Sequence, residues 1–406
     1  MTDTPTLLLT LVGRDRPGVT AAVFETLAGF GVEVLDIEQM VIRGRLVLGV
    51  LVTAPRSPAK LRGTVQATAA ALGMELEMVE GKGDSEQRRG GRAHVTILGQ
   101  PLQPLAVAAI TGRIADTGAN IDRIVRMAHY PVTAIEFQVS GADVDQLRAV
   151  LAKEAAARLV DVAVQRVGLL RHGHRLVVMD VDSTLVQGEI IDELAQHAGV
   201  GDRVAAVTEK AMQGEIDFEQ SLRQRVALLD GLDVGVLDEV YEAMQLSPGA
   251  HTMVRTLKRL GYQFGIVSGG FRQLTDRLAA DLGIDYAAAN QLEVVDGRLT
   301  GRLVGEVIDR RGKAEALRRF ADDSRITLDR TVAIGDGAND LDMLAAAGLG
   351  IAFNAKPAVQ QAAQTAVNVP YLDAVLYLLG ISREDIEAAD AEHGWTTPRP
   401  RVPRPH

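Results

Sequence analysis

Apolar and polar residues follow the same order twice in the N-terminal part of the chain. The first copy has a strand-like run at 7–12, a helical stretch at 19–30 and alternating stretches at 32–40 and 45–52. The second copy has a strand-like run at 94–99, a helical stretch at 105–117, a strand-like stretch at 133–139 and a helical stretch at 144–158. Strand, helix, strand, strand, helix, strand is the pattern of ferredoxin-like domains. We therefore expect two βαββαβ domains.

The pattern changes near residue 175, where apolar runs typical of buried strands begin to alternate with helical stretches. The expected strands are at 175–179, 263–267, 331–334 and 349–353. This alternation predicts a Rossmann-like parallel sheet with crossover helices. Residues 190–245 are helix-like throughout and interrupt the sheet pattern directly after its first strand, so we expect a helical cap at about 190–250.

These patterns divide the chain into four segments. The predicted domains are 1–82, 92–168 and 173–382, and a linker rich in glycine and charge at 81–91 joins the first two. The apolar pattern ends after Ile381, and residues 395–406 contain four prolines and three arginines. We therefore expect residues 383–406 to be a disordered tail.

Composition excludes several classes of protein. The formal net charge of the 406 residues is -10, which argues against a general nucleic-acid binder. The chain has no cysteine, so it has no disulfide and no thiolate metal site. It has neither a signal-peptide pattern at its N-terminus nor an apolar run long enough for a membrane helix, so we expect a cytoplasmic protein without a membrane partner.

Polar motifs follow three of the expected strands. Asp180 and Asp182 come after the first, Ser268-Gly269-Gly270 after the second, and Asp336 after the third. Ligands bind beyond the carboxyl ends of the strands in open parallel sheets, so these residues should meet at one edge. Lys313 begins a separate helical stretch between the second and third motifs.

The chemistry of this set suits phosphoryl transfer. Clustered carboxylates repel one another, and Mg²⁺ relieves that repulsion while binding a substrate phosphate. Lys313 and the Ser268 hydroxyl can donate to the phosphoryl oxygens. Asp180 can attack phosphorus, and Asp182, two residues later, can give a proton to the leaving alcohol.

Residues 175–380 resemble the haloacid dehalogenase superfamily of phosphotransferases through these motifs. The resemblance implies that Asp180 is the nucleophile, that Asp182 is the general acid and base, and that Ser268 and Lys313 hold the phosphoryl group. It also implies a Mg²⁺ ion bound by the Asp180 side chain and the Asp182 main-chain carbonyl.

The last motif, Gly335 to Asp340, completes the resemblance to that superfamily. It implies that Asp336 is a further metal ligand and that Asn339 and Asp340 support the site. Asn339 is also expected to contact the substrate.

The resemblance extends to the phosphoserine phosphatases within this superfamily, through residues 180–189 and 218–226. It implies hydrolysis of O-phospho-L-serine, the last step of serine biosynthesis. Glu189 would bind the ammonium group of the substrate, and Arg225 would bind its carboxylate. These two side chains would suit any amino-acid phosphate. The expected substrate contacts also include Met212 and Phe218 as apolar closing residues, the Gly269 and Gly270 backbone, Ser268 and Lys313. A phosphatase for another amino-acid phosphate, or a sensor with an idle phosphatase domain, remains an alternative.

The two N-terminal copies resemble ACT domains, which are small-molecule sensors of amino-acid enzymes. The turn at 13–18 carries the resemblance, and it implies Asp15 and Gly18 as effector-binding residues. We expect L-serine as the effector and a homodimer as the assembly. The alternative is that these domains serve only as a dimer interface.

Overall fold

The protein is represented by a computed structural model that describes residues 4–55, 57–83, 90–168, 173, 175–213 and 215–398, except for the side chain of Met212. The chain divides into two compact units, Met1–Arg89 and Gly90–His406, which are described separately. Across the described residues, no helix is both long and apolar enough to cross a membrane.

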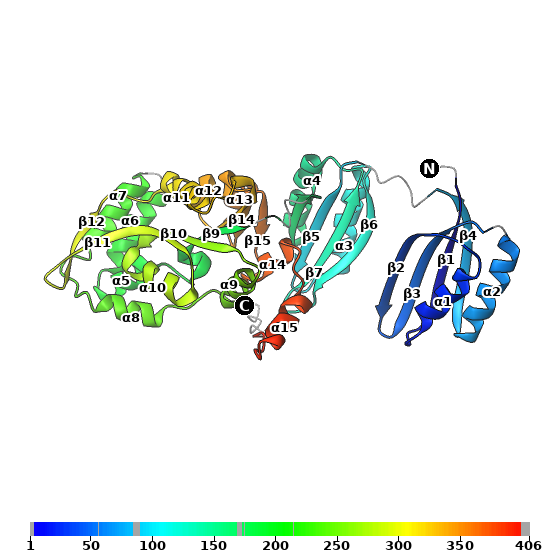
Figure 1. Ribbon diagram of the computed structural model, residues 1–406. Coiled ribbons are helices and arrows are strands. Elements are labelled where there is room, and N and C mark those ends of the chain that lie inside the picture. The colour runs from blue at the N-terminus through cyan, green and yellow to red at the C-terminus, as the bar shows by residue number, and fades with distance from the viewer. Residues whose placement is uncertain are drawn as a thin grey trace. The chain divides into compact units, whose positions relative to one another are not determined.

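The first unit is a βαββαβ domain with a four-stranded antiparallel sheet in the order β2-β3-β1-β4. Its elements are β1 (Pro5–Arg14), α1 (Val19–Ala28), β2 (Val34–Ile42), β3 (Arg45–Thr53), α2 (Pro58–Ala71) and β4 (Met74–Lys82). Figure 1 shows both helices on one face of the sheet. Alternate residues of β1 and β3 point toward these helices, and the resulting core belongs to this unit alone.

The second unit begins with a domain of the same topology, with sheet order β6-β7-β5-β8. Its elements are β5 (Ala93–Gly99), α3 (Pro104–Asp116), β6 (Asn120–Ala128), β7 (Thr133–Ser140), α4 (Val144–Arg158) and β8 (Asp161–Arg166). Both ferredoxin-like folds predicted from the sequence are thereby confirmed.

This second domain packs against the C-terminal domain through one continuous apolar core. Leu98 and Ala163 of its sheet belong to the same buried cluster as Tyr371. Next to this cluster, the buried Asp161 carboxylate accepts hydrogen bonds from the Asn368 backbone N–H (2.6 Å) and side-chain amide (2.7 Å). The second βαββαβ domain is therefore part of the body that contains the C-terminal sheet.

The C-terminal domain is built on a seven-stranded sheet in the order β12-β11-β10-β9-β13-β14-β15. The strands are β9 (Leu176–Asp180), β10 (Gln263–Phe271), β11 (Tyr286–Val295), β12 (Arg298–Val304), β13 (Thr331–Gly335), β14 (Leu349–Phe353) and β15 (Thr365–Val367). All neighbours are parallel except β11 and β12, which form an antiparallel pair. The predicted parallel sheet is confirmed, whereas the sequence pattern did not predict β11, β12 or β15.

Helices surround this sheet (Figure 1). They are α5 (Ile190–His197), α6 (Gly201–Met212), α7 (Phe218–Ala227), α8 (Val236–Ala243), α9 (Ala250–Arg259), α10 (Arg272–Leu282), α11 (Arg310–Asp323), α12 (Leu341–Ala346), α13 (Pro357–Ala362), α14 (Ala374–Leu378) and α15 (Arg383–Glu392). The first four form the predicted helical cap between β9 and β10. The β11–β12 hairpin packs against the cap, where the Leu299 N–H donates to the Leu232 carbonyl over 2.9 Å.

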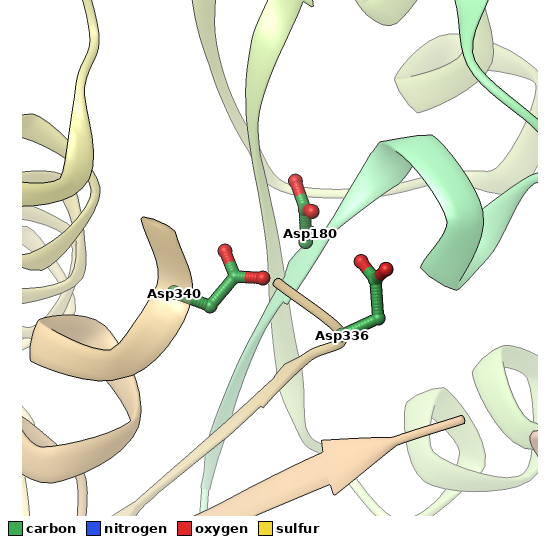
Figure 2. A group of neighbouring side chains, drawn as sticks. All are labelled: Asp180, Asp336 and Asp340. Atoms are coloured by element: carbon green, nitrogen blue, oxygen red, sulfur yellow. The ribbon is translucent and has the colours of Figure 1, made fainter. Parts of the chain in front are cut away.

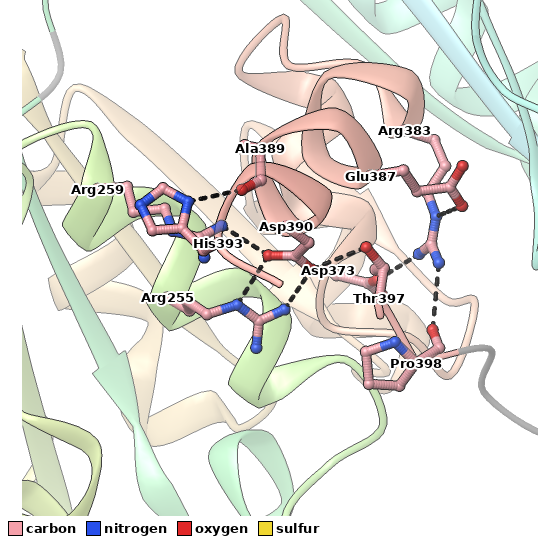
Figure 3. A network of polar contacts seen from close by, with 10 residues as sticks. All are labelled: Arg255, Arg259, Asp373, Arg383, Glu387, Ala389, Asp390, His393, Thr397 and Pro398. Carbon is pink, nitrogen blue, oxygen red and sulfur yellow. Dashed lines mark hydrogen bonds and ion pairs between the residues drawn. The ribbon is translucent and has the colours of Figure 1, made fainter. Parts of the chain in front are cut away.

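The prediction of a disordered tail from residue 383 is wrong for residues 383–398. Residues 383–392 form α15, whose buried Asp390 carboxylate pairs with Arg255 and Arg259 of α9, each at 2.6 Å (Figure 3). The buried Arg383 guanidinium donates to the Pro398 carbonyl over 3.1 Å, which fixes the chain after the helix. Residues 399–406 of the predicted tail lie outside the described residues.

Candidate active site

Three neighbouring parallel strands bring the predicted catalytic residues to one edge of the sheet. β9 lies between β10 and β13. Asp180 is the last residue of β9, Ser268 lies near the carboxyl end of β10, and Asp336 directly follows β13. The residues meet because parallel strands all end at the same edge.

The side chains of Asp180, Asp336 and Asp340 lie close together at this edge (Figure 2). One ligand atom from each of them lies within 4.8 Å of the others. The Lys313 Nζ atom, from the first turn of α11, lies 2.7 Å from Oδ1 of both Asp180 and Asp340. Lys313 is only 1% exposed, so this ammonium is committed to the cluster.

The electrostatics of the cluster favour a bound cation. Burial, and then the charge of Asp340, raise the pKa of Asp180 well above its ordinary value. Burial also raises the pKa of Asp336 to about 6. Burial opposes the charge on Lys313, but the neighbouring Asp180 and Asp340 carboxylates outweigh it and raise the pKa of this ammonium. Negative charge still exceeds positive charge, and an all-oxygen donor set of this kind fits a divalent cation such as Mg²⁺.

The Asp182 side chain has hydrogen-bond partners of its own outside the three-carboxylate cluster. Its Oδ1 accepts a hydrogen bond from the Ile190 N–H at the start of α5, over 2.9 Å. Its Oδ2 accepts from the Ser268 hydroxyl over 2.8 Å, and Ser268 Oγ in turn accepts from the Gly270 N–H over 2.7 Å. These hydrogen bonds fix the orientation of the Asp182 carboxylate at the cavity.

Two polar residues that the sequence interpretation left without a role orient Asp336. The fully buried Thr184 donates through Oγ1 to Asp336 Oδ1 over 3.2 Å. The Thr184 carbonyl accepts from the Ser247 hydroxyl over 2.6 Å. Thr184 belongs to the same motif as Asp180 and could have been identified from it, whereas Ser247 carries no signal in the sequence.

A cavity of about 580 Å³ lies over the acidic cluster and beneath the cap. Ten of the predicted site residues line it, namely Asp180, Asp182, Glu189, Phe218, Arg225, Gly269, Gly270, Lys313, Asp336 and Asn339. The lining also includes Asp192, Arg310 and Lys356, to which the sequence interpretation gave no role. Ser268 lies fully buried behind Gly269 and Gly270.

Opposite charges flank the cavity on the cap side. Arg225 comes from α7, and its buried Nε atom has no hydrogen-bond partner in the described part of the chain. Glu189, directly before α5, accepts a hydrogen bond from the Ser183 hydroxyl over 3.0 Å. Loss of bulk water around the Glu189 carboxylate, and then the charge of Asp182, raise its pKa to about 7. A guanidinium with a free Nε–H and a carboxylate on the same cavity can receive a ligand that carries both charges.

The cap and the sheet meet at Phe218. A Cβ atom on Gly269 would lie 3.0 Å from Phe218 Cζ, so a larger residue at position 269 would require the ring to move. Gly270 is equally restricted, because its Cβ would lie 2.9 Å from Asp182 Oδ2. Met212, the other predicted closing residue, ends α6, and its side chain lies outside the described atoms.

The predicted effector residues lie in the first unit. Asp15 and Gly18 belong to the turn between β1 and α1, where the Asp15 N–H donates to the Gly44 carbonyl over 2.8 Å. Gly18 directly precedes α1 with a φ of 93°, a conformation that favours glycine. The turn is therefore shaped by its own backbone requirements, and its ligand remains a prediction.

Curated relatives match nearly the full length of the chain. A phosphoserine phosphatase of Streptomyces coelicolor is 60% identical over 96% of this chain and 95% of its own length. The chain belongs to the phosphoserine phosphatase family. Another member, phosphoserine phosphatase SerB2 of Mycobacterium tuberculosis, is 51% identical over 95% of both chains.

The domain assignments of this family member agree with the fold. Residues 177–345 match the haloacid dehalogenase-like hydrolase family, and residues 5–79 and 92–165 each match an ACT domain family. A crystal structure of a probable phosphoserine phosphatase from Vibrio cholerae, in unliganded form, is 36% identical with a TM-score of 0.57 over 75% of this chain and 90% of that one. A HAD family hydrolase from Salmonella enterica serovar Typhi is 28% identical with a TM-score of 0.63, over 71% of this chain and 98% of that one.

Proposed function

We propose that this chain hydrolyses O-phospho-L-serine to L-serine and phosphate through an aspartyl phosphate on Asp180. This proposal is carried by the position of Arg225 and Glu189 in the same cavity as Asp180, together with the buried Arg225 Nε atom that has no hydrogen-bond partner among the described residues. Phosphoserine presents a carboxylate, an ammonium and a phosphate, and these groups complement Arg225, Glu189 and the cluster around Lys313. The relatives that match nearly the whole chain bear the name of this activity.

Mg²⁺ is the metal that we assign to the site. Asp180 and Asp336 would hold it together with the Asp182 main-chain carbonyl, and Asp340 completes the acidic cluster. The ion would neutralise charge on the phosphoryl oxygens during transfer. Without it, the crowded carboxylates would repel an anionic substrate.

The protein side chains divide the chemistry between them. Asp180 attacks phosphorus and forms an acyl phosphate, while the Asp182 carboxyl group gives a proton to the departing seryl oxygen. Asp182 then takes a proton from the water that attacks the acyl phosphate, and phosphate leaves Asp180 free. Lys313 donates to the phosphoryl oxygens throughout, and Ser268 does so when its hydroxyl turns from Asp182 to the phosphoryl group.

Phosphate release from a panel of esters tests this function. Phosphoserine should give the highest kcat/KM among phosphoserine, phosphothreonine, homoserine phosphate and p-nitrophenyl phosphate, and chelation of Mg²⁺ should stop release. A higher value for another amino-acid phosphate would assign that substrate instead. No release from any ester with Mg²⁺ present would leave the domain as an idle part of a sensor.

Substitution of Arg225 tests how the substrate is recognised. Arg225→Ala removes the carboxylate contact, so kcat/KM for phosphoserine should fall by about 100-fold or more, while that for p-nitrophenyl phosphate changes little. Arg223→Ala is the matched control, because Arg223 lies on the same helix and pairs at the surface with Glu219. Equal losses on both substrates in Arg225→Ala would contradict this role.

We also propose that the chain forms a homodimer through its ACT domains and that L-serine binds near Asp15 and Gly18. β2 is an edge strand of the first sheet and exposes five large apolar residues, namely Val34, Ile37, Met40, Val41 and Ile42. An apolar, unpaired edge favours association with another chain. Light scattering of the full chain should therefore give twice the mass of one chain.

The cytoplasmic location of the protein stays a prediction.

A further inference from the structure

The cavity-lining segment of β10 leaves the regular ladder with β11. Val267 pairs with Ala288, and the next pair is Phe271 with Asn290. Between these two pairs β10 advances by four residues and β11 by two, so Ser268, Gly269 and Gly270 form a bulge. Gly269 and Gly270 of this bulge line the cavity. A bulge of this kind redirects side chains and N–H groups, but it also removes main-chain groups from their ladder partners. Something else must hold the bulge in place.

Asn290 lies opposite this bulge and holds it. Its side-chain Nδ2 donates to the Gly269 carbonyl over 2.8 Å, and its Oδ1 accepts from the Ile308 N–H over 2.7 Å. Asn290 is only 3% exposed, so water does not replace these contacts easily. One partner is an acceptor and the other a donor, and this pair of partners fixes which way the amide is oriented.

The second partner leads directly to Lys313. Ile308 precedes Asp309, which is the N-cap of α11 and accepts from the Gly312 N–H over 2.8 Å. Lys313 follows in the first turn of that helix, with its Nζ in the acidic cluster. A single amide therefore connects the Ser268–Gly270 bulge to the helix start that positions the ammonium.

We infer that Asn290 is a positioning residue that sets the distance between the Ser268–Gly270 bulge and Lys313. This inference rests on the proposed function, in which both elements hold the phosphoryl group. Asn290 does not line the cavity, so it acts through the two main-chain groups that it binds. Aspartate at position 290 would place a carboxylate oxygen against the Gly269 carbonyl, and these two acceptors repel each other. Leucine would leave both main-chain groups without a hydrogen-bond partner.

The test compares Asn290→Leu and Asn290→Asp with Gln273→Leu. Gln273 is the matched control, because its side chain donates to the Leu292 carbonyl on the same strand as Asn290, over 2.8 Å, and its recorded side-chain hydrogen bonds are to Leu292 alone. Both Asn290 variants should lose about 10- to 100-fold in kcat, as expected when reacting groups are displaced. Gln273→Leu should lower the Tm by a similar amount and keep kcat within about 2-fold of the parent protein.

Two further readouts separate positioning from a general loss of structure. The kcat of Asn290→Asp should fall by the same factor on phosphoserine and p-nitrophenyl phosphate, because only the phosphoryl end is affected, and the inhibition constant of inorganic phosphate should rise. A loss confined to phosphoserine, an unchanged phosphate inhibition constant, or an equal loss in Gln273→Leu would overturn the inference. If the parent protein prefers another ester, the comparison on p-nitrophenyl phosphate still decides the role of Asn290.

Discussion

Loss of contact with water changes the acidity of individual side chains at this site. Asp180 is buried beside Asp340, which raises the pKa of Asp180, and the Lys313 ammonium offsets only part of this effect. Burial and the neighbouring negative charge disfavour the ionised form of this carboxyl group in the free protein. A bound cation would favour the ionised form. The nucleophilic role that we propose for Asp180 would therefore depend on the charges of neighbouring residues and of a bound metal.

Glu189 provides a prediction about pH at the residue scale. Its pKa is raised to about 7, mainly because protein displaces water around it, and only its anionic form can pair with the substrate ammonium. The ratio of kcat/KM for phosphoserine to that for p-nitrophenyl phosphate should therefore rise as the pH increases through about 7. The ratio cancels the titration of groups that act on both esters.

Glu189→Gln is the variant that checks this assignment. It removes the titrating group, so the ratio should become low and independent of pH between about 6 and 8. An unchanged rise with pH in this variant would assign the titration to another group.

The prediction at the element scale concerns α15. Asp390 is fully buried and accepts hydrogen bonds from Arg255, Arg259 and Thr397 (Figure 3). The Arg255 guanidinium also lies over the Trp395 ring, 4.8 Å from the ring centroid. Asp390→Asn would leave two arginines without their counter-charge. The free energy of unfolding should fall by about 3 kcal/mol, as measured by urea denaturation.

Asp276→Asn is the control for that measurement. Asp276 pairs with Arg272 on the exposed surface of α10, and its loss should cost less than about 1 kcal/mol. A similar small change for Asp390→Asn would mean that α15 contributes little to the stability of the domain.

Elements differ in how well their sequence predicts them. Apolar runs lead up to Asp180, Ser268 and Asp336, and the sequence therefore predicts both the strands and the edge at which these residues meet. β11 contains the polar Asn290 in mid-strand, whose partners Gly269 and Ile308 are distant in sequence, so its pattern is ambiguous. α15 is largely polar and is fixed by arginines 131 and 135 residues away, which no local pattern reveals.

The two ACT domains have different relations to the rest of the molecule. Each has a core of its own, but the sheet of the second also contributes Leu98 and Ala163 to the core of the phosphatase domain. Removal of residues 1–89 should therefore leave a folded phosphatase, with kcat for phosphoserine within about 2-fold of the full chain. A longer deletion that includes the second domain would expose the core around Leu98 and Ala163 and is not a clean test.

The same truncation tests the proposed effector site. If L-serine acts at the turn around Asp15 and Gly18, it should inhibit the full chain and no longer inhibit residues 90–406 beyond simple product competition. Substitution of Asp15 by alanine in the full chain should weaken inhibition without changing kcat. Identical inhibition of all three proteins would place the effect of serine at the catalytic cavity.

The most direct measurement for the whole account is chemical trapping of the phosphorylated protein. Enzyme mixed with ³²P-labelled phosphoserine and Mg²⁺ is quenched in acid within one turnover, and borohydride then reduces any acyl phosphate to an alcohol. Peptide mass spectrometry should find homoserine at position 180, and Asp180→Asn should retain no label. Label at another residue, or a burst of free phosphate with position 180 unmodified, would contradict the account.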